Sequence, residues 1–304
     1  MNLRGGAAPI EMPAGVLVST AVAVPPLSEL ELDRRRYRRG RAQRSALVAV
    51  ISTSLFAIVA VAAVVNAPGW ERFRQAFLDL NVASSSFSFI LGGLWLNLRL
   101  LAVTEVVVLI VALFVASLRT LRSPVLFPFR AMATAYVDFF RGLPLIILLY
   151  LVGFGLPSLR LSFVPTDPTI LGGIALVLCY GAYVAEVFRS GIDGVHPSQR
   201  NAAASLGLSP LQTMRLVVLP QAVRRVLPPL LNDFVALQKD VGLVSLLGAV
   251  DAIRSAQIIN AETYNYTPYL VAGLMFIALA VPSGRLADYV GARARRREQA
   301  GSVV

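Results

Sequence analysis

Four polar residues interrupt an otherwise apolar stretch at residues 225–247: Asn232, Asp233, Lys239 and Asp240. If this stretch crosses a membrane, each charged side chain costs about 2.5–3.5 kcal/mol on insertion scales, so it is rarely exposed to lipid. A spacing of seven residues is nearly two helical turns, so Asn232 and Lys239 share one face and the two aspartates share a neighbouring face. Three interpretations stay open: a buried ion-pair network, in which Lys239 pairs with an acid of another helix, a polar lining of a path for a zwitterionic solute, or the water-exposed end of a span.

Two further acids lie in apolar surroundings. Glu105 is alone within the stretch 90–118, where it is either a buried structural acid or part of the same path. Glu186 lies near the end of the stretch 170–188, within reach of Arg189. Tyr180, Tyr183 and Glu186 recur at every third residue, and the small pair Gly181 and Ala185, four residues apart, favours close helix packing over binding.

Several kinds of chemistry are excluded by what the sequence lacks. It has one cysteine, Cys179, and one histidine, so no spacing for a zinc or other metal site exists. It has no G-x-x-x-x-G-K-[ST] phosphate loop, so the chain does not hydrolyse ATP itself. We therefore expect neither an enzyme nor a bound cofactor.

The elements that carry these residues are predicted to be membrane helices. Hydrophobic residues make up 56% of the chain and charged residues 15%, which excludes disorder and points to a polytopic membrane protein. Six apolar stretches approach the length of about 17–25 residues that a span needs. They lie at about 45–65, 90–118, 132–156, 170–188, 225–247 and 266–284, and Arg141-Gly142-Leu143-Pro144 breaks the third.

Arginine clusters set the orientation of these spans. They precede the first stretch, follow the second, lie between the fourth and fifth, and end the chain. Because basic residues concentrate on the cytosolic side, both termini are predicted to be cytosolic. The predicted order is a basic, irregular tail (1–44), an additional N-terminal span (45–66), an extracytoplasmic connection (67–87), a transmembrane core (88–290) and a basic tail (291–304).

The connection between the fourth and fifth stretches, residues 196–220, has ordered helix signals. Pro197 suits the first turn of a helix, and Gly207 supplies a left-handed residue that ends it. Ser209 then opens a second helix in a capping-box pattern with Gln212. Pro220 is expected to close that second helix and to open the fifth span.

This helix–glycine–helix pattern has three interpretations. Its alanine-rich surface can pack closely against another protein. A helix-turn-helix DNA reader has a similar pattern, but it needs a compact domain around it. A structured loop without a partner is the third.

The segment Asn201-Ala-Ala-Ala-Ser-Leu-Gly207 followed by Val218-Leu-Pro220 resembles the "EAA" loop in permeases of bacterial ATP-binding cassette (ABC) importers. The resemblance covers about residues 88–290 and is to the polar amino acid type. Other matching segments are Ala135–Pro144, Tyr180–Glu186, Leu219–Ala222, Lys239-Asp240 and Leu243–Ser245.

The resemblance implies an all-α fold: a five-helix core of the type I ABC importer permease, with the additional N-terminal span, in the bacterial inner membrane. It implies import of a polar or charged amino acid by alternating access, driven by an ATPase dimer that binds ATP and Mg. Other implied partners are an extracytoplasmic solute-binding protein, a second permease copy or a sister permease, and the lipid bilayer, with no nucleic acid. The implied ATPase-coupling residues are Asn201, Ala202, Ala203, Leu206, Gly207 and Pro220.

The chain departs from the family pattern at three places. Asn201 replaces the family's acidic residue, Ser198 stands beside Gln199 where the family has the glycine of a Gly-Gln pair, and Val241-Gly242 replaces its usual Thr-Ser. The sequence leaves two other functions open. One is a proton-coupled secondary carrier that uses Glu105, Asp233 or Lys239 as its coupling group. The other is a membrane-tethered helix-turn-helix regulator.

Overall fold

The computed structural model describes residues 29–120 and 124–301, and all the regular structure in these ranges is helical. The chain divides into two compact units, Met1–Trp70 and Glu71–Val304. Four described helices are long and apolar enough to cross a membrane, and two bent helix pairs raise that number to six if each pair is one span. The expected all-α membrane fold with about six spans is confirmed.

The described part of the first unit consists mainly of α1 (Glu29–Val65), whose apolar part, Gln43–Val65, is long enough to span a membrane. The helix includes residues 29–44, so our expectation of an irregular tail is wrong for this part. Glu, Leu and Arg are good helix formers, and adding turns to an existing helix is easier than starting one. The rest of the predicted tail, residues 1–28, lies outside the described residues.

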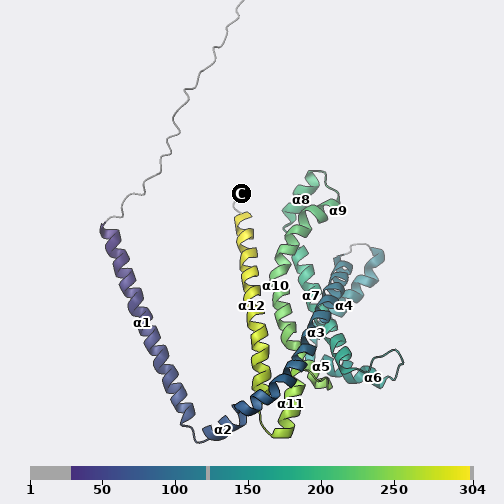
Figure 1. The fold of residues 1–304 in the computed structure, drawn as a ribbon. Helices are drawn as coiled ribbons and strands as arrows, with labels where there is room; N and C mark the ends of the chain where they lie inside the picture. Colours follow the sequence, from purple (N-terminus) through teal and green to yellow (C-terminus); the bar gives the residue numbers. More distant parts are fainter. Residues whose placement is uncertain (1–28, 121–123, 302–304) are drawn as a thin grey trace, which may run out of the picture. The chain divides into compact units, whose positions relative to one another are not determined.

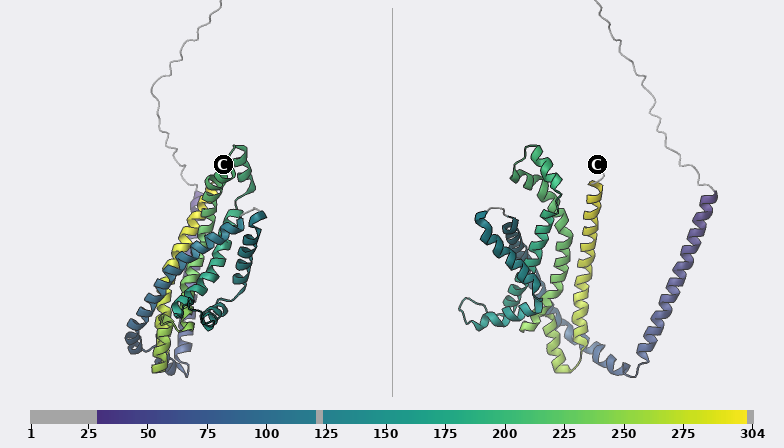
Figure 2. Two further views of the ribbon diagram at one scale, coloured as in Figure 1. Left: turned by 90° about the vertical axis from the view of Figure 1, so that its right-hand side faces the viewer. Right: turned by 180° about the vertical axis from the view of Figure 1, so that it is seen from behind.

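In the second unit, four long helices pack along one another (Figures 1 and 2). Buried side chains such as Val108, Leu176 and Leu237 form the main core between three of them. α3 begins earlier than expected, and α12 continues into the predicted tail as far as Gly301. The four helices are α3 (Leu80–Thr120), α7 (Pro168–Asp193), α10 (Leu219–Asp240) and α12 (Thr267–Gly301).

The predicted break in the third span is present. α4 (Phe127–Gly142) ends directly before Leu143-Pro144, and the helical segment Leu145–Ser158 continues at 108° to it. That segment comprises α5 (Leu145–Tyr150), a π-helical turn (Leu151–Gly155) and α6 (Leu156–Ser158). Proline lacks an N–H group and disfavours helical backbone in the residue before it, so the helix stops here.

Helix α11 (Ala252–Thr263), which follows a 3-10 segment, Val241–Leu247, was not predicted. The side chain of Asp251 caps it by accepting a hydrogen bond from Arg254 N at 2.8 Å. Asn97 of α3 fixes this turn, because it donates to Asp251 Oδ2 (3.0 Å) and accepts from Ala252 N (3.1 Å). Asn97 and Asp251 are both buried.

The short helix α2 (Trp70–Phe77) holds the turn between α11 and α12. Tyr266 N donates to Ala76 O at 2.7 Å, and the Phe77 and Tyr266 rings stack with centroids 5.0 Å apart. Within the second unit, α11 lies at the opposite end from α8 (Pro197–Ser205) and α9 (Pro210–Thr213) (Figures 1 and 2).

Candidate coupling loop and polar cavity

The predicted helix–glycine–helix element is formed. α8 begins at Pro197, and its last carbonyls accept bonds from Gly207 N (2.9 Å, to Ala204 O) and Leu208 N (3.1 Å, to Ala203 O). Gly207 has a φ of +79°, in the left-handed region that glycine adopts without a steric cost. The turn direction therefore depends on Gly207.

The second helix begins with the predicted capping box. Ser209 Oγ accepts from Gln212 N at 3.3 Å, and Gln212 Oε1 accepts from Ser209 N at 2.8 Å. The expected end of this helix at Pro220 is wrong, because α9 runs through a π-helical turn (Met214–Val218) directly into α10. Leu219 N donates to Met214 O across that turn, and Pro220 follows directly as the second residue of α10.

The surface of this loop is apolar at its tip. Leu206 and Leu211 are 82% and 78% exposed. Asn201 and Ala202 are exposed as well, whereas Ala203 is buried beneath the helix. Two large exposed leucines on either side of a tight turn make an apolar patch of the kind that binds another protein. Leu211 was not among the predicted residues, since sequence alone does not show which leucines stay uncovered.

The loop is held firmly by the ends of α7 and α10. Arg200 Nη2 donates to Ile192 O at 2.6 Å, which joins α8 to the last turn of α7. Val195, Val218 and Ala222 form a small buried cluster under the loop. α8 is therefore bonded directly to the end of α7, and the ends of α7 and α10 pack together beneath the loop.

A second feature is a polar cavity of about 290 Å³ between α7, α10 and the break in the third span. Tyr180 donates its hydroxyl to Asp240 Oδ2 at 2.7 Å, and Asp233 Oδ2 is buried without a partner among the described residues. The residues that line this cavity are Leu143, Pro144, Leu145, Cys179, Tyr180, Tyr183, Asp233, Ala236 and Asp240.

The predicted polar residues thus separate into two groups. Asp233 and Asp240 share the cavity, and Glu105 of α3 lies close enough to Asp233 for their charges to interact. Asn232 and Lys239 are exposed on another face, and Lys239 forms no ion pair with any residue in the described ranges. Within residues 29–120 and 124–301, the ion pair of Lys239, one of the three interpretations left open by the sequence, is therefore absent. Tyr180 and Tyr183 line the cavity, and Tyr180 is also part of the buried core, so a place at the cavity adds to the predicted helix packing.

Glu186 forms a third feature, separate from the cavity. Its carboxylate pairs with Arg189 Nη2 at 2.6 Å, as predicted, and with Arg119 Nη1 of α3, also at 2.6 Å. Arg141 Nη1 of α4 lies 4.0 Å away. These two partners lie far from Glu186 in the sequence, so spacing alone could not identify them.

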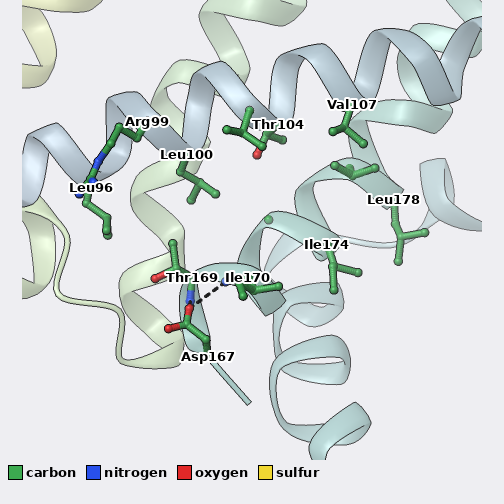
Figure 3. A pocket seen from close by; sticks show the side chains of 13 residues that line it. Leu96, Arg99, Leu100, Thr104, Val107, Asp167, Thr169, Ile170, Ile174 and Leu178 are labelled. Atoms are coloured by element: carbon green, nitrogen blue, oxygen red, sulfur yellow. Dashed lines mark hydrogen bonds between the residues drawn. The ribbon is translucent and has the colours of Figure 1, made fainter. Parts of the chain in front are cut away.

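A larger pocket of about 640 Å³ lies between α3 and α7 and is mainly apolar (Figure 3). Its acidic residue, Asp167, caps α7 by accepting from Thr169 N (2.8 Å) and Ile170 N (3.1 Å). None of the predicted charged residues lines it. The polar cavity, although smaller, is therefore the better candidate for a polar solute.

Comparisons with known proteins agree with this architecture. Residues 109–296 match the family described as "Binding-protein-dependent transport system inner membrane component". The chain is 35% identical to an arginine transport system permease protein of Bacillus subtilis, over 67% of this chain and 91% of that protein. It is 33% identical to a putative glutamine transport system permease protein of Rickettsia prowazekii, over 64% of this chain and 87% of that protein.

Solved structures give the same result. A crystal structure of an amino acid ABC transporter with histidines has 30% identity, a TM-score of 0.66 and coverage of 71% of this chain and 98% of that chain. An inward-facing methionine ABC transporter, at 22% identity and a TM-score of 0.53, shares the fold.

Neither of the two other functions, a secondary carrier or a DNA-binding regulator, is supported by these matches. The family is the membrane component of importers whose ATP hydrolysis takes place in a separate subunit, so the chain is not an enzyme. The chain belongs to the binding-protein-dependent inner membrane components and is a permease subunit of an ABC importer in the bacterial inner membrane.

Proposed function

We propose that this permease imports a polar or charged amino acid by alternating access, and that a dimer of separate ATPase subunits docks on α8 and drives it. The relatives named as arginine and glutamine permeases support the class of solute. ATP and Mg bind to the ATPase subunits, and the permease itself needs no cofactor. The observation that carries the proposal is the exposed leucine pair beside the rigid turn at Gly207.

In the proposed complex, α8 and α9 face the cytosol with both chain termini. Leu206 and Leu211 enter an apolar cleft of the ATPase, and the exposed Asn201 and Ala202 lie along its rim. Asn201 keeps a hydrogen-bonding group where a carboxylate stands in the family, so it contributes no charge to the contact. An extracytoplasmic solute-binding protein delivers the amino acid on the opposite side, and a second permease copy or a sister permease completes the path.

The polar cavity is the proposed part of that path within this subunit. Asp233 and Asp240, with Glu105 nearby, provide negative charge that attracts the ammonium group of an amino acid. The cavity borders the break at Leu143-Pro144, where the backbone is free of regular helix bonding. Irregular backbone at membrane depth is tolerated where it lines such a cavity.

Docking is tested by replacing the exposed leucines. Leu206→Ser and Leu211→Ser are expected to reduce copurification of the ATPase, because each removes an apolar anchor worth about 1.5–3 kcal/mol when buried. Leu80→Ser is the matched control, since Leu80 is 83% exposed in the second unit at the start of α3. Unchanged copurification in both loop variants, and in Gly207→Val, would contradict the docking model.

A further inference from the structure

Glu186 connects three helices through one carboxylate. Arg119 of α3 has a side chain only 8% exposed, and its Nη1 pairs with Glu186 Oε2 at 2.6 Å. Arg189 of α7 pairs with the other oxygen at the same distance, and Arg141 of α4 approaches Oε2 at 4.0 Å. Each oxygen thus pairs closely with one guanidinium, which joins the ends of α3 and α7, and the end of α4 approaches the same carboxylate through Arg141.

The network continues from Glu186 toward the coupling loop. Arg189 Nη1 also pairs with Asp193 Oδ2 at 3.2 Å, at the last residue of α7. The preceding residue, Ile192, accepts the bond from Arg200 of α8. The final turn of α7 is therefore bonded to Glu186 through Arg189 and to the coupling helix through Arg200.

The network also continues from Glu186 toward the polar cavity. The guanidinium of Arg141 lies 5.7 Å from the centroid of the Tyr183 ring, and Tyr183 donates its hydroxyl to Arg141 O at 3.3 Å. Arg141 is in the last turn of α4, immediately before the break. Tyr183 and Leu143-Pro144 line the cavity. The arginine that approaches Glu186 thus contacts the cavity wall directly.

We propose that Glu186 is a positioning residue that transmits movement of the coupling loop to the break that borders the cavity. This inference rests on the proposed function. When the ATPase tilts α8, Arg200 pulls on the last turn of α7. The ion pairs of Glu186 then move Arg141, and with it Leu143-Pro144. Because a carboxylate holds several guanidinium groups in fixed directions, a neutral amide of the same shape weakens this link without leaving a gap.

The test uses the complete transporter, with its ATPase and solute-binding protein, in liposomes. The quantity measured is the ratio of solute-stimulated to basal ATP hydrolysis. Glu186→Gln is expected to lower this ratio about tenfold, within the range of typical coupling energies, while the ATPase still copurifies. Glu186→Asp keeps the charge and is expected to recover part of the ratio.

Two controls separate coupling from loss of stability. Asn97→Ala breaks a buried polar link elsewhere in the core and is expected to lower the melting temperature but not the ratio. Glu71→Gln removes an exposed ion pair with Arg74, outside the network, and is expected to change neither.

A second variant keeps the inference testable if Glu186→Gln fails to fold. Arg141 is 42% exposed, so Arg141→Gln removes the link to the break at little cost to folding. An unchanged ratio in Arg141→Gln, or loss of the copurified ATPase in Glu186→Gln, overturns the inference. A wild-type transporter without solute-stimulated hydrolysis would instead contradict the proposed function.

Discussion

At the scale of single residues, the acids within the second unit differ in the partners that their carboxylates have. Both carboxylate oxygens of Glu186 pair with arginines. Asp251 accepts hydrogen bonds from the Asn97 side chain and from the backbone N–H of Arg254. Asp233 keeps a buried oxygen without a partner in the described chain, and it faces a cavity. A buried polar atom without a partner is costly, so Asp233 is the acid with most to gain from a bound cation.

Replacing Asp233 should weaken the binding of the transported solute. We expect Asp233→Asn to raise the solute concentration for half-maximal transport about tenfold, since a hydrogen bond to a charged group contributes about 1.5–3 kcal/mol. Uptake by reconstituted transporter measures this, with the exposed neighbour Asn232→Ala as the control. Equal values for both variants would remove Asp233 from the path.

At the scale of elements, the sequence predicts a structural feature when the residues that form it are neighbours in the chain. The capping box at Ser209 and the left-handed turn at Gly207 depend on neighbouring residues, and both are present. The partner of Asn97 lies 154 positions away, so no spacing predicts it. α11 was missed for the same reason, because it is fixed by contacts with α3. The exposure of Lys239 also depends on how distant helices pack.

The crossing of α3 and α11 provides a paired test with two neighbouring glycines. A Cβ atom at Gly93 would lie 2.4 Å from the backbone carbon of Asp251, whereas one at Gly92 would have nothing within 4 Å. Gly93→Ala is therefore expected to destabilise the protein by about 1–3 kcal/mol, and Gly92→Ala to be neutral or slightly stabilising. Thermal unfolding in detergent measures both, and equal melting temperatures would refute the close crossing.

At the scale of the whole molecule, the second unit has two functional ends. α8 and α9 lie at one end, and α11 with the turn to α12 lies at the other (Figure 1). The arginine distribution predicts that the first end is cytosolic. The ATPase and the solute-binding protein would then bind at opposite ends of the same helices.

This orientation can be tested by labelling single cysteines, because the one native cysteine, Cys179, is buried. In intact cells, an impermeant thiol reagent is expected to label Thr263→Cys, at the end of α11, but not Ser205→Cys, at the end of α8. Inside-out vesicles should give the reverse result. Labelling of Ser205→Cys in intact cells would invert the topology and exclude docking of the ATPase on α8.

The π-helical turn at Met214–Val218 has a consequence for how this protein can change during evolution. Such a turn holds one more residue than an α-helical turn, and each residue of an α-helix adds about 100° of rotation. A deletion of one residue here would rotate Leu211 around the axis of α10 by about that angle, away from its present direction. The length of this segment is therefore under stronger constraint than a uniform α-helix would suggest, because an insertion or deletion of one codon would turn the α8–α9 loop away from the proposed ATPase contact.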